Sequence, residues 1–484
     1  MQLPSTLAVQ PADRQGSDFL RPSSLPCALA VLSLALPARA DEGRSQDFAP
    51  GARATALGGA FGALSDDATG VFYNPAGLVD VRTARVNVAT QLLGLELVGA
   101  SPIQSDLLRR GVSATDVIFV PGSTGYVQGV GDPLPSGAFQ DAFAIGTVIP
   151  DYTSRFLEEL PESDSGTRFR SSLTDRRLNA GAAWAHRLGP WLRVGAAGHY
   201  LLRTLDAEES LVSGDLGVAG AFIDATTRLR TSSHALRAIF GAKLWLGPRL
   251  TLGLAATTPG LSLWRDVTFE RTVASSDGTT AVLAVDRVRD NGFELQSDLP
   301  GSLRLGLAFS QPASHTFSVD VTGYLPTGYD VVPPALLNDV AVASVPVVLR
   351  VDRGWLANIA VGVDTLINDD LSLAAGLFTN FAAAPELLVT SDGALAGASS
   401  RLSRVHMIGG SLSLGFHGRF SVTRVGLTGS SGFGEIVQPA APDVRFLADG
   451  PPLRAVQANQ TLLYLFWSST FRFGDESSER DYAL

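Results

Sequence analysis

From about Thr83 to Phe473 the chain is a series of short segments in which apolar residues alternate with small or polar ones. A period of two is that of a β-strand whose two faces meet different surroundings. Gly and Ala are common on the second face, which fits a confined interior better than the charged, solvated face of a soluble sandwich. The pattern therefore predicts an all-β protein, a transmembrane antiparallel β-barrel. On two of its segments the side chains expected to face lipid are Leu303, Leu305, Leu307, Val319 and Val321.

About fourteen such segments can be counted, an even number as in bacterial outer-membrane barrels. The second is interrupted by Pro121 and Gly122. A further pair, Trp264–Ala274 and Ala284–Leu295, predicts either an extra hairpin inside a long loop or two more barrel strands. The fourteen segments lie near residues 83–99, 114–130, 140–150, 176–187, 191–204, 234–246, 249–258, 302–310, 314–324, 355–365, 371–380, 404–416, 418–428 and 459–473.

The connections alternate in length, as the short periplasmic turns and long outer loops of such barrels do. Short turns are expected at 188–190, 247–249, 311–313, 368–370 and 417–418. Long polar connections are expected at 204–233, 259–300, 326–354, 380–404 and 429–459.

The two ends of the chain have a different character. Residues 1–40 resemble a signal peptide, with an apolar run at Cys27–Leu36 and a small-residue cleavage site at Ala38–Ala40. Cys27 is the one cysteine, so cleavage would leave no thiol or disulfide, which fits an exported protein. Residues 475–484 form a charged tail beyond the last strand.

Composition excludes several classes of function. At 45% hydrophobic and 17% charged the chain is too apolar to be disordered, yet no apolar run reaches the ~18 residues of a spanning helix. A formal charge of −10 argues against nucleic-acid binding. The sequence has no HExxH and no GxSxG motif, so we expect no metal, no cofactor and no catalysis.

Between the signal peptide and the first strand lies a stretch rich in small residues, 51–78. Asn74 and Pro75 form a helix-start signal, because Asn is a strong N-cap and Pro suits the first helical position. Asp66 and Asp67 offer a second set of capping oxygens, and Gly58 and Gly59 permit close backbone approach. The spacing fits neither a phosphate loop nor a calcium loop. Short helices packed in a confined space are expected.

Three parts of this stretch, Ala56–Phe61, Asp66–Ala68 and Tyr73–Leu78, resemble the N-terminal hatch of the long-chain fatty acid outer-membrane transporters, the FadL-like family. The resemblance implies a barrel at 83–474 with 41–82 as a plug inside it. It also implies passive uptake of hydrophobic molecules such as fatty acids or hydrocarbons across a bacterial outer membrane. The partners so implied are that ligand, outer-membrane lipid and lipopolysaccharide, and the barrel-assembly machinery, with no nucleic acid.

Two groups of residues are candidates for function. The plug or gate candidates are Phe48, Gly58, Gly59, Phe61, Asp66, Asp67, Asn74, Pro75 and Ala76. The polar candidates inside the lumen are Arg193, Arg203, Arg304, Asp320 and Arg472. Phe48 is the one large apolar residue of Asp41–Pro50, and we expect it to occupy the ligand path until a ligand displaces it.

A symmetric turn at Pro312 would place Arg304 opposite Asp320 as a cross-strand ion pair. Two other functions fit the same pattern. One is a structural or secretion-associated barrel of the same shape, and the other is a porin for polar solutes.

Overall fold

The computed structural model describes residues 49–100, 113–135, 137–159, 168–214, 220–277, 279, 281–292, 297–311, 314–331, 350–386, 402, 404–439 and 453–473. All of them belong to one compact unit, Arg39–Leu484. The predicted signal peptide, the predicted tail and Phe48 lie outside the described residues, so the hypothesis that Phe48 is displaced by ligand stays a prediction.

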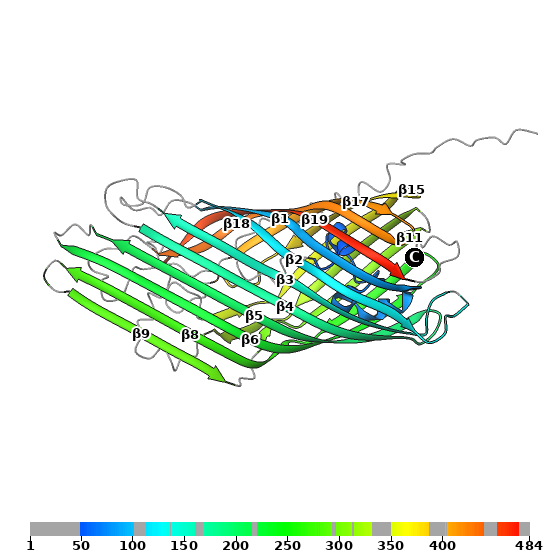
Figure 1. Ribbon diagram of the computed structural model, residues 1–484, viewed down its shortest axis with the longest axis horizontal. Coiled ribbons are helices and arrows are strands. Elements are labelled where there is room, and N and C mark those ends of the chain that lie inside the picture. The colour runs from blue at the N-terminus through cyan, green and yellow to red at the C-terminus, as the bar shows by residue number, and fades with distance from the viewer. Residues whose placement is uncertain are drawn as a thin grey trace, which may run out of the picture. The chain divides into compact units, whose positions relative to one another are not determined.

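Strands β1 to β19 include a closed antiparallel barrel of 14 strands (Figure 1). Each strand pairs with the next, and β1 closes the ring by pairing with both β2 and β19. The predicted fold class is therefore confirmed. The barrel strands are β1 (Ala84–Ala100), β2 (Ser113–Val130), β3 (Asp141–Glu159), β4 (Arg168–Arg187), β5 (Leu192–Ser213), β6 (Ala221–Trp245), β7 (Leu250–Thr257), β11 (Ser302–Gln311), β12 (His315–Tyr324), β15 (Leu356–Asn368), β16 (Leu371–Asn380), β17 (Arg404–His417), β18 (Ser421–Pro439) and β19 (Leu453–Phe473).

Several strands are longer than the sequence predicts. The expected polar connection 204–233 is mostly strand, because β5 and β6 stay paired as far as Ser213 and Ile223. Ion pairs between neighbouring strands, such as Arg230 with Asp206 at 3.0 Å, line the outer face there. The polar residues that suggested a loop are thus the solvated face of an extended wall, with Ala207 and Leu229 packed on its inner face.

The segment after β7 forms a hairpin and not two more barrel strands. β8 (Gly260–Asp277) pairs with the first part of β6, Ala221–Leu236, while β7 pairs with its last part, Ile239–Trp245. β9 (Ala281–Gly292) pairs with β8, and the short β10 (Ser297–Leu299) follows. A separate two-stranded sheet, β13 (Thr327–Asp330) and β14 (Arg350–Arg353), contributes Tyr329 and Val351 to the apolar cluster inside the extended wall.

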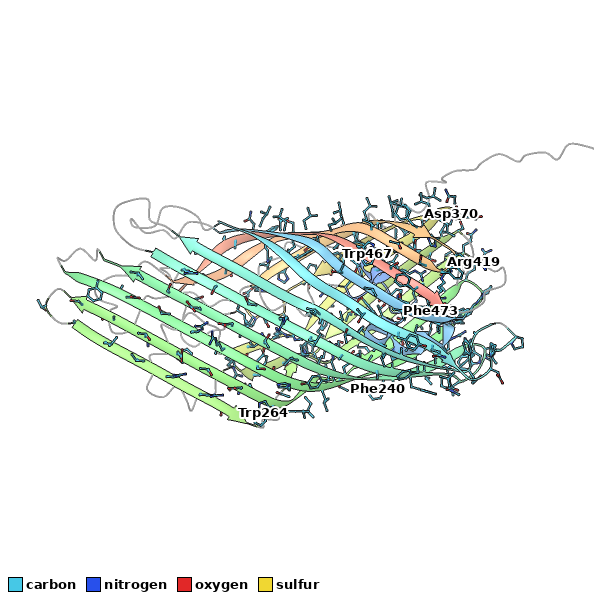
Figure 2. The ribbon with its side chains drawn as sticks, viewed as in Figure 1. Phe240, Trp264, Asp370, Arg419, Trp467 and Phe473 are labelled. Atoms are coloured by element: carbon cyan, nitrogen blue, oxygen red, sulfur yellow. The ribbon has the colours of Figure 1, made fainter. Side chains whose placement is uncertain are left out.

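The alternation along β11 and β12 has the predicted orientation. Leu303, Leu305 and Leu307 are exposed on the outer surface, as is Val321, whereas Val319 is half-buried. Other large apolar side chains, Phe240 and Phe473 among them, also project from the outside of the wall (Figure 2). No helix among the described residues is long and apolar enough to cross a membrane.

Residues 49–81, here called the plug, lie within the ring of strands and contain α2 (Ala52–Ala56), α3 (Gly70–Tyr73) and the 3-10 helix η1 (Pro75–Asp80). The wall approaches the plug closely because it presents glycine there. A methyl group added at any of these glycines would come within 3.0 Å of a neighbouring atom, closer than atoms can pack. The glycines are Gly125, Gly195, Gly241, Gly253, Gly306, Gly362 and Gly376, on seven different strands.

The pairing of β2 with β3 is incomplete. It begins where Val130 pairs with Asp141 and ends where Ser123 pairs with Val148. Among the described residues no further pair joins the two strands. On their other side residues 113–118 and Val120 pair with β1, and 151–159 pair with β4. Pro121 and Pro150 lie in this region and have no N–H to donate. The second strand therefore exists, but Pro121, which the sequence predicts as an interruption, coincides with a gap in the ladder.

Leu305→Arg should destabilise the barrel by about 2–4 kcal/mol, because it places a charge on the lipid-facing side of a mid-barrel strand. Leu283→Arg is the matched control, since Leu283 is 70% exposed on β9, a strand that also carries Arg287, the ion-pair partner of Glu270. Refolding into lipid vesicles along a denaturant series measures both. Equal stability of the two variants would show that the face of β11 is misassigned.

Gly376→Ala should loosen the plug without unfolding the barrel, because its methyl group would overlap the backbone of Leu57 and Gly58. Gly198→Ala is the control, since no described atom lies within 4 Å of the methyl group it adds. We expect faster proteolysis of the plug and a raised leak of small sugars from vesicles for the first variant alone. A tight, protease-resistant Gly376→Ala plug would contradict the close packing.

Candidate functional site: the plugged lumen

The end of the plug is organised by Asn74. Its Oδ1 accepts a hydrogen bond from the Ala76 N–H at 3.1 Å, and Pro75 occupies the first position of η1, so the predicted helix start is observed. Its Nδ2 donates to the carbonyl oxygens of Gly62 in the plug and Ala242 in β6, at 2.9 and 3.0 Å. One fully buried side chain thus caps a helix and fastens two segments together.

The other small and apolar candidates form the interior of the plug. Gly58 and Gly59 end α2 with φ of 63° and 92°, the left-handed conformation in which a side chain is strained. Phe61 is fully buried and meets the Tyr73 ring edge to face, with ring centres 5.4 Å apart. Leu57 and Leu64 join them in one cluster.

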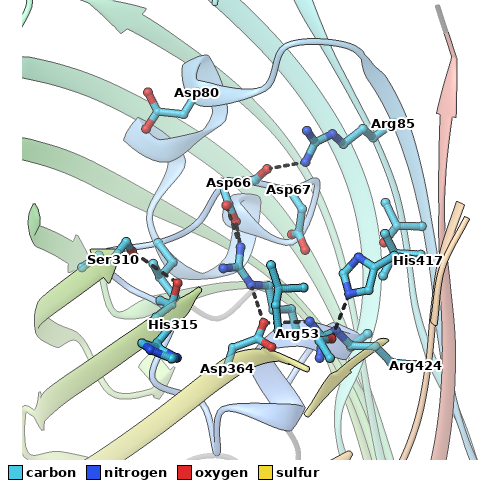
Figure 3. A pocket seen from close by; sticks show the side chains of 18 of the residues that line it. Arg53, Asp66, Asp67, Asp80, Arg85, Ser310, His315, Asp364, His417 and Arg424 are labelled. Atoms are coloured by element: carbon cyan, nitrogen blue, oxygen red, sulfur yellow. Dashed lines mark hydrogen bonds and ion pairs between the residues drawn. The ribbon is translucent and has the colours of Figure 1, made fainter. Parts of the chain in front are cut away.

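Asp66 and Asp67 have different roles. Burial would raise the pKa of Asp66, but the charge of Arg53, whose Nη1 is 2.6 Å from Oδ2, helps to hold that pKa below its usual range. Burial raises the pKa of Asp67, and the charge of Asp66 raises it further. Asp67 accepts hydrogen bonds from the Thr69 N–H and hydroxyl, which fixes the turn before α3. Figure 3 shows Asp66 and Arg53 beside Asp364 of β15.

A charge cluster that sequence reasoning missed holds the last residue of η1. The Asp80 carboxylate lies 2.8 Å from Arg193, 2.9 Å from Lys243 and 3.1 Å from Arg187. Burial would raise its pKa, but Lys243 and Arg193 hold the pKa below its ordinary value. Lys243 also donates to the Leu64 carbonyl oxygen at 2.6 Å. Arg193, predicted only to face the lumen, is therefore part of the plug's anchor.

The sequence did contain one signal for this cluster. Lys243 is the only lysine of the chain, and it lies on the inward face of β6 among glycine and alanine. A lone buried amine in such surroundings needs a carboxylate partner.

The predicted ion pair of Arg304 with Asp320 is wrong. Arg304 is opposite Thr322 and donates to its hydroxyl at 3.2 Å, while Asp320 is opposite Gly306. The observed pairing of Gln311 with His315 is centred one residue beyond Pro312, so the partner of each β11 residue lies two positions further along the chain than predicted. Asp320 instead accepts the backbone N–H groups of Phe61 and Gly62, at 3.1 and 2.7 Å, and so binds the plug to β12.

Arg203 and Arg472 lie away from this contact. Arg203 pairs with Asp175 at 2.6 Å and donates to the Tyr329 hydroxyl at 2.7 Å, in the extended part of the wall. Arg472 is opposite Arg85 and lines the pocket at the short-turn end of the barrel.

The plug separates two pockets of unlike chemistry. The pocket beside the short turns, about 170 Å³, is rich in charge, with Arg53, Asp66, Asp364 and Arg424 on its walls (Figure 3). The pocket on the side of the long connections, about 100 Å³, has aromatic walls. They include Tyr73, Tyr324, Phe378 and Tyr464, together with threonine and asparagine side chains. Among the described residues no group of three or more His, Cys, Asp or Glu could hold a metal ion.

The sequence matches no protein-family model and no curated protein. Solved structures match over most of the chain. A FadL homologue of Pseudomonas aeruginosa has a TM-score of 0.60 at 11% identity, with 89% of this chain and 100% of that chain covered. The toluene transporter TodX of P. putida has a TM-score of 0.57 at 14% identity, with the same coverage.

A third structure, the monoaromatic hydrocarbon channel CymD, has a TM-score of 0.51 at 12% identity, again covering 89% of this chain and 100% of that one. At such identities the likeness concerns the fold. The fold of this chain, a 14-strand barrel around an N-terminal plug, is that of the FadL-like barrels, as the sequence of the plug indicates.

Proposed function

We propose that this protein is an outer-membrane channel for passive uptake of hydrophobic small molecules, gated by the plug. The observation that carries the proposal is the division of the lumen by a plug that packs against the wall through glycine. Polar solutes meet a closed barrel, whereas an apolar molecule meets aromatic walls on the side of the long connections. Such walls with a few placed polar groups are typical of small-molecule sites.

The structures of similar fold carry names that agree with this function. They include a toluene transporter and a monoaromatic hydrocarbon channel. An apolar solute crosses the polar lipopolysaccharide layer poorly, so a protein path through it is useful. The partners we propose are the hydrophobic ligand, outer-membrane lipid and lipopolysaccharide, and the barrel-assembly machinery.

We place the exit of the ligand in the wall at the β2–β3 gap and not along the barrel axis. A route along the barrel axis leads through the charged pocket around Arg53, where an apolar molecule makes no favourable contacts. Within a membrane every unpaired backbone group costs several kcal/mol, so a ladder is interrupted only where the interruption is useful.

Next to the last pair of that ladder the outer surface is hollowed. The hollow is apolar and measures about 1090 Å³. It is lined by Thr124 and Thr147, which flank the gap, and by the exposed side chains of Ile145, Tyr200 and Leu236. A molecule leaving the gap would enter an apolar surface open to lipid.

Cells that produce the protein should take up a fluorescent long-chain fatty acid or labelled toluene faster than cells without it, with no matching rise in the uptake of a disaccharide. The plug is the reason, since it blocks water-filled passage. Conductance in planar bilayers checks that polar solutes do not pass. A polar-solute porin would reverse the two results, and a structural barrel would give neither.

Pro121→Val with Pro150→Val restores two N–H donors at the gap and should extend the β2–β3 ladder. We expect slower uptake of the hydrophobic probe at equal barrel abundance. Pro326→Val, an exposed position between β12 and β13, is the control and should leave uptake unchanged. Unaltered uptake by the double variant would place the exit elsewhere.

A further inference from the structure

Three polar side chains converge where the aromatic pocket meets the plug. They are Tyr73 of α3, Arg304 of β11 and Asp320 of β12. The guanidinium carbon of Arg304 lies 4.6 Å from the centre of the Tyr73 ring. Tyr73 and Asp320 are 3% and 2% exposed, so each is almost fully removed from solvent.

Each of the three has one buried atom without a hydrogen-bond partner among the described residues. The atoms are Tyr73 Oη, Arg304 Nη1 and Asp320 Oδ1. Their neighbours on the same side chains are engaged, since Asp320 Oδ2 accepts two plug amides and Arg304 Nε donates to Thr322. Buried polar atoms are nearly always paired in native proteins, so three together indicate a place where a ligand supplies the partners.

The remaining wall of this pocket combines apolar and aromatic side chains with hydroxyl and amide groups such as those of Thr322, Asn358 and Asn380. Ile359, Phe378 and the rings of Tyr324 and Tyr464 contribute to it. Within this mixed wall, the atoms without a partner among the described residues are two donors and one charged acceptor.

A hydroxyl group is the complement of such a set. It can accept a hydrogen bond from Arg304 or Tyr73 and donate its own hydrogen to Asp320. A carboxylate would bring a second negative charge against Asp320, and a bare hydrocarbon would leave all three atoms unpaired. Sites built to bond a hydroxyl discriminate strongly against analogues that lack it.

We propose that this site recognises the hydroxyl group of a neutral hydrophobic compound, a phenol or an aliphatic alcohol, as it reaches the plug. The inference rests on the proposed function and names the substrate class within it. The pocket is about 100 Å³, less than the ~150 Å³ of a cavity that takes benzene. The hydroxyl end therefore enters, and the rest of the molecule lies in the lumen above.

The same carboxylate links the ligand to the plug. One oxygen of Asp320 accepts hydrogen bonds from the amides of Phe61 and Gly62, and the other, which has no partner among the described residues, is the one that we assign to the ligand. Occupancy of the site and seating of the plug thus influence each other reciprocally.

The test is calorimetric titration of the full chain in detergent with 4-ethylphenol, ethylbenzene and 4-ethylbenzoate at neutral pH. The three probes share a ring and tail and differ in the polar group. We expect 4-ethylphenol to bind about tenfold more tightly than either of the others, the effect of one to two hydrogen bonds.

Tyr73→Phe removes one oxygen and keeps the ring contacts with Phe61 and Arg304. It should lower the affinity for 4-ethylphenol by about 3- to 10-fold and leave the affinity for ethylbenzene unchanged. Tyr200→Phe, a hydroxyl deletion on the outer wall, is the control. Asp320→Asn keeps a carbonyl oxygen for the plug amides and removes the charge. It should therefore lower the affinity for 4-ethylphenol and raise the affinity for 4-ethylbenzoate.

Equal affinity for all three probes, or tightest binding of the benzoate to the parent, overturns the hydroxyl site. Tyr73→Phe and Asp320→Asn variants that bind as the parent does overturn it as well. In each of these cases the uptake of fatty acid or toluene described above would still support a channel. Failure of that uptake, in contrast, removes the proposed function itself.

Discussion

The close approach of plug and wall is the constraint on which the rest of this structure depends. Seven inward-facing glycines remove the side chains that would otherwise hold the plug away, so the two backbones lie in contact. Contact at that range lets side chains of the wall reach plug carbonyl groups. Ser318 donates to the Ala60 oxygen at 2.7 Å, and Ser411 donates to the Ala56 oxygen at 2.8 Å. The alternation of small and apolar residues along the strands is thus needed for the plug as much as for the membrane.

Charge then fixes the orientation of the plug. Asp80 meets three cations from three neighbouring strands, and Arg53 meets Asp66 and Asp364. Buried ion pairs add little net stability because desolvation offsets their attraction, but a mispaired charge is costly. A plug turned or shifted by one residue would leave several charges unpaired. The charges also lie on the short-turn side, which leaves the aromatic pocket on the other side for apolar ligands.

The sequence predicts those parts of the fold that repeat or are local. Period-two alternation places Leu305 and its neighbours correctly, and Asn74 caps η1 because its partner, Ala76, is two residues away. Features that depend on distant segments are not predictable in this way. Asp80 meets Arg187 and Arg193 across 107 and 113 positions, and no local pattern relates them. The prediction of an Arg304–Asp320 pair was wrong because the register of a hairpin depends on the conformation of its turn, and composition does not determine that conformation. The extended β5 and β6 were read as loops because a solvated strand face and a loop share the same polar residues.

Mass spectrometry of the compounds retained by the protein after mild extraction from outer membranes tests the central claim most directly. A barrel whose plugged lumen holds hydrophobic ligand should release defined hydrophobic small molecules on denaturation, in a fixed ratio to protein. An unrelated barrel purified in the same detergent should not release them. If both preparations release only detergent and bulk membrane lipid in the same proportions, the lumen is not a site for hydrophobic ligands and the account is contradicted.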